Sequence, residues 1–317
     1  MNNLNQSPHI SICIPAYKRI EFVKRVLDSI VIQEYRDFEV VVTDDSPDLS
    51  VKELCEQFSS KIPIRYFRNE ITLGTPENWN EGIRRAKGKW IKLMHDDDWF
   101  NGPKALASFA KATEQFPDAE FIFSAYTNYF EDGTKQKVRV NGFRMRSLLK
   151  EPATLFSSNI IGPPSVILHR NDGKFFYDRS IKWVVDIDFY IRYLQNANPF
   201  YIDKFLVNVG LGAHQVTMDC VRQRPVEIPE NFYLLNKTGY GVLKNVMVFD
   251  AWWRLMRNLE ISSEKDIRDA GYQGEIPEVI KNIISIQQRI GLKSLKVGIR
   301  SKLAMYRAFR KFKSQNN

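Results

Sequence analysis

The sequence predicts an α/β fold, in which a mostly parallel sheet is flanked by helices and followed by a helical C-terminal region. Short β-branched segments alternate with segments of helical periodicity over the first 125 residues. About the last 90 residues show helical periodicity. Alternation of this kind indicates βαβ units, so the N-terminal strands are expected to run parallel.

The strands are expected at residues 9–15, 38–43, 62–67, 89–94 and 120–124, and the helices between them at 20–32, 50–59, 76–87 and 104–116. Gly88 would end the third helix, as glycine commonly does. Residues 128–173 look rich in loops, and residues 181–196 show the spacing of a helix. A linker is expected at 213–229, and clear helices at 249–259 and 277–290.

Composition narrows the class of protein. The chain has 317 residues, 44% of them hydrophobic, which suits one large globular domain with or without an appendage. A net charge of +9 favours acidic partners such as nucleotide phosphates, nucleic acid or an anionic membrane. The three cysteines (Cys13, Cys55 and Cys220) lack metal-ligand spacing, which suggests a reducing, cytoplasmic setting. Neither a signal peptide nor a long apolar run is visible, so a soluble or membrane-surface protein is expected.

Polar clusters follow three of the predicted strands. They are residues 15–19 after the first strand, 44–46 after the second, and 95–98 after the fourth. The carboxyl ends of parallel strands meet at one edge of a sheet, where open α/β folds bind ligands. Carboxylates gathered at one edge require a compensating charge. A divalent cation such as Mg²⁺ or Mn²⁺ would supply it and leave coordination places for substrate phosphates.

Each acidic cluster also has a simpler interpretation. Asp96, Asp97 and Asp98 could form a solvated turn that caps the next helix, and Asp44 and Asp45 belong to a natural turn sequence. Their shared position at strand ends favours the metal site over the turns.

Five segments together resemble glycosyltransferase family 2, whose members have the GT-A fold. The segments are SICIPAYKR (11–19), FEVVVTDDS (38–46), RNEITLGTPENWNEGIRRAKG (68–88), KWIKLMHDDDWF (89–100) and VVDIDFYIRY (184–193). Their order and spacing also resemble the family's, over about residues 9–215. The resemblance implies a GT-A catalytic domain at 1–215, with a nucleotide-sugar half at about 1–100 and an acceptor half at about 101–215. Residues 216–317 would form the helical region.

The resemblance also implies roles for particular residues. The general base would be Asp186, and the donor-binding residues would be Pro15, Ala16, Tyr17, Arg19, Asp45, Asn80 and Asp96. Asp45 would bond the ring NH of the base, and Asp96 the ribose. The metal ligands would be Asp97, Asp98 and the histidine of GLGAHQVT, His214. His95 stands where the family has a leading aspartate, which leaves open whether the ligand pair is Asp96 with Asp98.

These roles imply an inverting transferase that uses Mn²⁺ or Mg²⁺. The metal would stabilise the leaving nucleotide diphosphate while Asp186 deprotonates an acceptor hydroxyl. The expected donor is a UDP-sugar carrying a hexose, although thymidine would present the same ring NH. The expected acceptor is a glycan or a lipid-linked oligosaccharide, in bacterial surface polysaccharide synthesis.

The C-terminal tail allows two interpretations. From Arg289 to the end there are nine Lys or Arg and no Asp or Glu, and apolar residues recur at helical spacing. The tail could be an interfacial helix on the inner face of the cytoplasmic membrane, which would make the enzyme peripheral. Equally, it could pack on the protein with its charges in water.

Other classes fit the sequence less well. The chain lacks a recognisable nucleic-acid-binding motif, so no nucleic-acid partner is expected. A NAD enzyme or a nucleotidyltransferase would carry a glycine-rich loop after the first strand, where this chain has PAYKR. A non-catalytic nucleotide-sugar binder would need Asp45 and Asp97 but not Asp186.

Overall fold

A computed structural model describes residues 7–212 and 220–315. The chain divides into two compact units. The first unit comprises residues 1–149 and 160–213, and the second comprises residues 150–159 and 214–317. Residues 150–159 fall within the catalytic domain predicted at 1–215, because their sequence carries no local mark of a change of unit.

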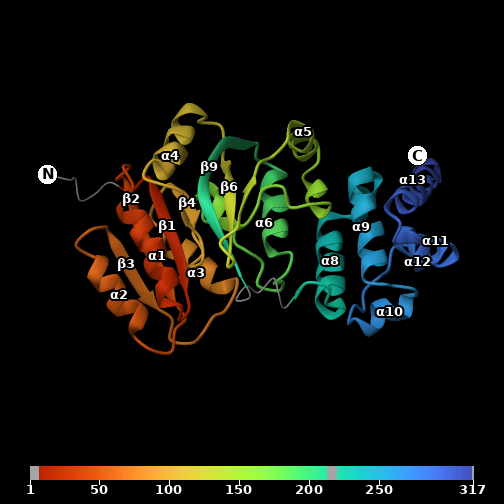
Figure 1. The fold of residues 1–317 in the computed structure, drawn as a ribbon, viewed down its shortest axis with the longest axis horizontal. Coiled ribbons are helices and arrows are strands. Elements are labelled where there is room, and N and C mark those ends of the chain that lie inside the picture. The colour runs from red at the N-terminus through yellow and green to blue at the C-terminus, as the bar shows by residue number, and fades with distance from the viewer. Residues whose placement is uncertain (1–6, 213–219, 316–317) are drawn as a thin grey trace. The chain divides into compact units, whose positions relative to one another are not determined.

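The first unit is built on a mixed sheet with the strand order β3-β2-β1-β4-β8-β6-β9-β5, and β7 pairs with β6 (Figure 1). The strands are β1 (Ile10–Ala16), β2 (Phe38–Asp44), β3 (Ile64–Arg68), β4 (Trp90–Leu93), β5 (Trp99–Phe100), β6 (Phe121–Phe130), β7 (Lys135–Val138), β8 (Ile167–Arg170) and β9 (Pro199–Leu211). The first four are parallel, as predicted. Beyond β4 the sheet is mixed, since β8 is antiparallel to both neighbours while β6 and β9 are parallel.

Helices connect and cover these strands. They are α1 (Ile20–Val31), α2 (Ser50–Phe58), α3 (Glu77–Arg85), α4 (Ala105–Gln115), α5 (Gly142–Lys150) and α6 (Val185–Leu194). In α1 the buried apolar residues recur three and four apart, at Val23, Val26, Leu27 and Ile30, so one stripe of the helix is buried. Helix α3 contacts β1 and β2, and α4 contacts β6 and β9.

The third helix ends earlier than predicted. It stops at Arg85, and Ala86 already has extended backbone (ψ 138°). Gly88 therefore does not end the helix. A Cβ atom at Gly88 would lie 2.5 Å from the backbone nitrogen of Ser11, so glycine is needed for the close approach to β1.

Two segments predicted to be irregular contain regular structure. Residues 128–173 hold the end of β6, then β7, α5, β8 and the 3₁₀ helices η1 (Pro152–Phe156) and η2 (Pro164–Val166). The predicted linker at 213–229 is wrong in its second part, because α8 (Arg224–Thr238) begins there. Pro225 occupies the first turn of α8, where no backbone N–H is needed, and Pro229 lies inside the helix.

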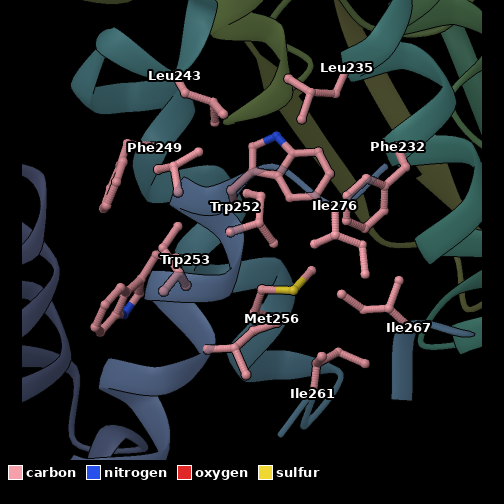
Figure 2. Close-up of a cluster of buried hydrophobic side chains, with 14 of the residues drawn as sticks. Phe232, Leu235, Leu243, Phe249, Trp252, Trp253, Met256, Ile261, Ile267 and Ile276 are labelled. Carbon is pink, nitrogen blue, oxygen red and sulfur yellow. The ribbon is translucent and has the colours of Figure 1, made fainter. Parts of the chain in front are cut away.

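The second unit is helical and has its own core. Besides α8 it contains η3 (Tyr240–Lys244), α9 (Val246–Asn258), α10 (Glu264–Asp269), α11 (Glu278–Ile290), α12 (Leu292–Leu295) and α13 (Gly298–Gln315). Figure 2 shows Phe232, Trp252 and Met256 among the side chains that fill this core. The helices predicted at 249–259 and 277–290 are confirmed as α9 and α11. Among residues 7–212 and 220–315, no helix has the length and hydrophobicity needed to cross a bilayer.

Candidate active site

The three polar clusters meet at one edge of the sheet, as the strand order predicts. Ala16 lies opposite Asp44 in the β1–β2 register, and Cys13 lies opposite Leu93 in the β1–β4 register. The backbone oxygen of Ala16 accepts a hydrogen bond from the Asp45 amide at 3.0 Å. Arg19 pairs with Asp96 at 2.9 Å. The first cluster therefore contacts both of the others.

Asp45 is buried and bound by a loop that follows β3. Its Oδ1 accepts hydrogen bonds from Asn69 Nδ2 at 2.8 Å and from the Leu73 amide at 3.0 Å. Its Oδ2 accepts one from the Gly74 amide at 2.8 Å. A carboxylate oxygen can accept two hydrogen bonds, so Oδ2 has capacity for one more donor.

The turn after β1 combines buried and exposed residues. Pro15 is half-buried and Ala16 is buried, whereas Tyr17 is 44% exposed. Lys18 has a left-handed backbone (φ 65°), and its amide donates to Ser46 Oγ at 2.7 Å. This bond ties the turn to the end of β2 and leaves the ring of Tyr17 accessible to a ligand.

Asn80 lies on α3 and bonds the backbone of Tyr177 in both directions. Its Oδ1 accepts from the Tyr177 amide at 2.8 Å, and its Nδ2 donates to the Tyr177 oxygen at 2.9 Å. The Nδ2 atom also donates to Glu77 at 3.0 Å. Both N–H groups of Asn80 are thus used within the protein. In this structure the residue predicted to bind the donor holds the 177 segment in place.

All three aspartates of the triplet are buried. Burial raises the pKa of Asp96 to about 7, against the opposing charge of Arg19. Among the described residues, none bonds the second carboxylate oxygen of Asp96, Oδ2. A buried polar atom without a partner is costly, so Oδ2 is suited to receive a ligand hydroxyl.

Neighbouring elements fix the position of the triplet. The Gly210 amide on β9 donates to Asp98 Oδ1 at 3.1 Å, and Arg25 on α1 donates to the Asp97 backbone oxygen at 2.8 Å. A Cβ atom at Gly210 would lie 2.4 Å from that oxygen, so only glycine allows β9 to approach this closely. Burial, and then the charge of Asp97, raise the pKa of Asp98 well above its usual range.

His95, Asp97 and Asp98 form a group able to hold a metal ion. One ligand atom from each lies within 4.8 Å of the others. Burial lowers the pKa of His95 to about 4, so the ring is neutral at pH 7. Its Nε2 is buried and has no hydrogen-bond partner in the described part of the chain. Two carboxylates and a neutral imidazole can ligate a divalent metal ion, so these residues fit the predicted kind of cofactor.

His95 was not among the predicted ligands, because it stands where the family has an aspartate. Its position directly before three aspartates was the available signal. His214, the predicted ligand, lies outside the described residues. Gly210, whose amide contacts Asp98, precedes His214 by four positions in the chain.

Ser165 and Lys92 also support the triplet, and neither was among the predicted site residues. Ser165 Oγ accepts from the His95 amide at 2.9 Å, and the ammonium group of Lys92 donates to the Ser165 backbone oxygen. Burial lowers the pKa of Lys92 to about 7. In the sequence, Lys92 could have been noticed as a lysine within an otherwise apolar strand. Ser165 had no comparable signal, because its role depends on a distant segment folding onto β4.

Asp186 and Asp188 lie in the first turn of α6. Asp188 is completely buried and pairs with Arg192 at 2.8 Å, so its charge is compensated within the helix. Asp186 is only half-buried, and its Oδ1 accepts from the Ile187 amide at 2.8 Å. Burial, followed by the charges of Asp186 and Asp98, raises the pKa of Tyr126 to about 12. The charges of both carboxylates therefore act on the phenol of Tyr126.

The model of glycosyl transferase family 2 matches residues 11–182. The chain belongs to this family. An uncharacterized glycosyltransferase of Haemophilus influenzae is 33% identical over 114 residues, which are 36% of this chain and 37% of that protein. Another, from Rickettsia felis, is 31% identical over 50% of this chain and 23% of its own length. This chain therefore spans well under half the length of each of these two relatives.

Solved structures confirm the GT-A fold of this family 2 chain. The Staphylococcus aureus protein TarS, solved with UDP-GlcNAc, is similar with a TM-score of 0.64 at 16% identity, over 97% of this chain and 91% of TarS 1–349. The mannosyltransferase PcManGT of Pyrobaculum calidifontis, solved with GDP-Man and Mn²⁺, has a TM-score of 0.56 at 13% identity, over 98% of this chain and 84% of PcManGT.

Proposed function

We propose that the chain is an inverting glycosyltransferase that moves a hexose from a UDP-sugar to a glycan or a lipid-linked oligosaccharide. One observation supports this most directly. The parallel order of β1, β2 and β4 brings Asp45 and the metal-binding group to one edge of the sheet, and the charges of Asp186 and Asp98 both act on Tyr126, which supports a place for Asp186 near them. Family 2 membership supports the same activity.

The donor would lie along this edge with its base at Asp45. The spare acceptor capacity of Asp45 Oδ2 suits the ring NH of uracil, beside Pro15, Ala16 and Tyr17. Asp96 Oδ2 would accept a ribose hydroxyl, while Arg19 holds the other oxygen of that carboxylate. The UDP-GlcNAc bound by TarS supports a uridine donor.

Mn²⁺ or Mg²⁺ would be held by His95, Asp97 and Asp98, with His214 as a further proposed ligand. Bound there, the metal would neutralise the charge that develops on the departing diphosphate. The Mn²⁺ found in PcManGT with its donor supports this cofactor. The chain's own contribution is to hold the carboxylates in place through Ser165, Arg25 and Gly210.

Asp186 would be the general base. Its carboxylate takes the proton of an acceptor hydroxyl as that oxygen attacks the anomeric carbon and the bond to the diphosphate breaks. A single displacement from the opposite face of the sugar inverts the anomeric configuration. The position of Asp186 in the first turn of α6 stabilises the carboxylate through the helix dipole before the proton arrives.

The reaction would take place in the cytoplasm, in the synthesis of a bacterial surface polysaccharide. A lipid-linked acceptor would bring the enzyme to the inner face of the cytoplasmic membrane. Nucleic acid is not among the proposed partners.

A nucleotide-sugar panel tests the proposal. The purified chain is incubated with UDP-glucose, UDP-galactose, UDP-GlcNAc or GDP-mannose, with Mn²⁺ or with a chelator, and released nucleoside diphosphate is measured. We expect metal-dependent release from a UDP-sugar. Asp97→Ala should abolish this release, whereas Asp118→Ala, an exposed aspartate elsewhere, should not change it. Release that persists with chelator, or RNA binding without any release, would refute the proposal.

A further inference from the structure

Helix α13 has two apolar faces. Ser301, Met305, Ala308 and Phe309 are buried in the second unit. Trp253 Nε1 donates to Ser301 Oγ at 3.0 Å, and the ring of Phe309 lies 5.4 Å from that of Phe249. These contacts fix the helix on its own unit, so one of the two interpretations of the tail, packing on the protein, is confirmed.

The opposite face remains exposed. Ile299, Leu303 and Tyr306 are 77%, 55% and 53% exposed. They are spaced four and three residues apart, so they form one stripe along the helix. The buried residues cannot turn outward without breaking the core. The exposed stripe is therefore a second apolar surface, separate from the buried one.

Cations flank this stripe. Arg300, Arg307, Arg310, Lys311 and Lys313 are all exposed. No acidic residue of the described ranges, 7–212 and 220–315, forms an ion pair with any of these five. By contrast, Lys302 pairs with Asp250 at 2.9 Å and Lys296 with Glu260 at 3.4 Å. The outer surface of α13 thus combines an apolar centre with unpaired positive charge at its margins.

We propose that this outer surface of α13 docks on an anionic lipid bilayer. The apolar side chains would enter the boundary of the acyl chains, and the flanking cations would meet lipid phosphates. The docking proposal depends on the proposed function in one respect: a lipid-linked acceptor would place the enzyme at a bilayer. A second copy of the chain is a poorer occupant, because its cations would face the same cations. RNA would satisfy the cations but leave Ile299 and Leu303 in water.

Vesicle co-sedimentation of the full chain, without donor or metal, tests the proposal. We expect binding to phosphatidylcholine vesicles that contain phosphatidylglycerol, little binding to phosphatidylcholine alone, and weaker binding as salt rises. Ile299→Ser with Leu303→Ser should weaken partitioning by about tenfold or more. The matched control, Ile32→Ser with Leu49→Ser, removes the same two side-chain types from residues 53% and 46% exposed, and should bind like wild type.

The contribution of the flanking cations is tested with the same vesicle assay. Arg307→Glu with Lys311→Glu should weaken binding by about tenfold or more, whereas Arg36→Glu with Lys111→Glu makes the same change in net charge at other exposed positions and should have a much smaller effect. Circular dichroism checks that the variants are folded.

Three results would overturn the docking surface. They are absence of binding by wild type, equal loss in both members of a matched pair, and a change of oligomeric state in the Ile299 and Leu303 variant that accounts for its loss. Tight RNA binding that survives this variant would assign the surface to nucleic acid instead. Diphosphate release measured without vesicles separates failure of docking from failure of the proposed chemistry.

Discussion

Two aspartates on one helix show how environment decides the role of a residue. Asp186 and Asp188 are two positions apart in the first turn of α6. Asp188 is completely buried against Arg192, so its charge is already paired. Asp186 is half-buried and its charge acts on Tyr126 together with that of Asp98, so of the two it is the one we propose as the base.

Replacing Asp186 with asparagine therefore tests the base directly. Asp186→Asn keeps the shape of the side chain but removes its ability to take a proton. We expect transfer to fall by about a hundredfold or more. Affinity for the UDP-sugar, measured by calorimetry with Mn²⁺, should change by less than about twofold.

Asp188→Asn is the comparison variant. It leaves Arg192 without its charge partner and should lower the free energy of unfolding by about 3 kcal/mol without selectively affecting transfer. Transfer by Asp186→Asn at the wild-type rate would remove Asp186 from the proposed mechanism.

At the same scale, the sequence could identify residues whose signal is local. The acidic triplet and Asp45 follow short apolar strands, and strand order alone brings their segments together. Ser165 and Gly210 could not be identified in this way. Their roles depend on how η2 and β9 fold back onto the triplet, more than 60 positions away in the chain.

At the scale of elements, Glu39 joins three strands and the end of a helix. This buried residue of β2 accepts hydrogen bonds from Ser11 on β1 at 2.7 Å and from Arg65 on β3 at 2.8 Å. The Lys87 amide beyond α3 donates to it as well, at 2.6 Å. Burial alone would raise the pKa of Glu39, but these hydrogen bonds outweigh it and lower the pKa below its usual value of 4.5.

A lowered pKa makes stability depend on pH in a defined direction. Since the folded protein favours ionised Glu39, the stabilisation is fully present above pH 4.5 and is lost as pH falls through the lower folded-state pKa. We expect Glu39→Gln to cost about 2 kcal/mol at pH 7. The difference from wild type should shrink below pH 4.5, as urea unfolding across a pH series would show.

Glu114→Gln, at an exposed position of α4, serves as the control and should unfold like wild type at every pH. A Glu39→Gln deficit that is the same at pH 7 and in acid would contradict the ionic role of Glu39.

Element boundaries show where local signals fail. The N-terminal strands and helices were predictable because hydrophobic periodicity is strong there. Helix α8 was not predictable, because Pro225 and Pro229 are residues that usually interrupt helices. Pro225 is nevertheless compatible with α8, since it lies in the first turn. The regular structure in residues 128–173 was not predictable either, because β7 and α5 are largely exposed and show weak apolar periodicity.

At the scale of the whole molecule, the chain contains two cores. The first unit holds every described residue proposed for chemistry, and the second unit buries its own cluster around α9. The sequence predicted helices in the C-terminal region but not that residues 150–159 would join it. That assignment depends on the contacts of η1 with α9, which no local pattern reveals.

Two adjacent tryptophans in α9 test the second core. Trp252 and Trp253 are each 1% exposed. Trp253 Nε1 donates to Ser301 Oγ at 3.0 Å, whereas Trp252 Nε1 is buried without a partner among the described residues. Figure 2 shows the two indoles directed to different parts of the core. Substitution by phenylalanine removes similar volume at both positions, so the difference between the variants isolates the hydrogen bond.

We expect Trp253→Phe to be more destabilising than Trp252→Phe by about 1–3 kcal/mol. The first loses a made bond, while the second removes a buried donor that is unsatisfied. Urea unfolding of the full chain followed by circular dichroism measures the difference. Equal losses would show that Trp252 Nε1 has found a partner, such as a water molecule. UDP-sugar affinity should change by less than about twofold in both variants, because every described residue proposed to bind the donor belongs to the first unit.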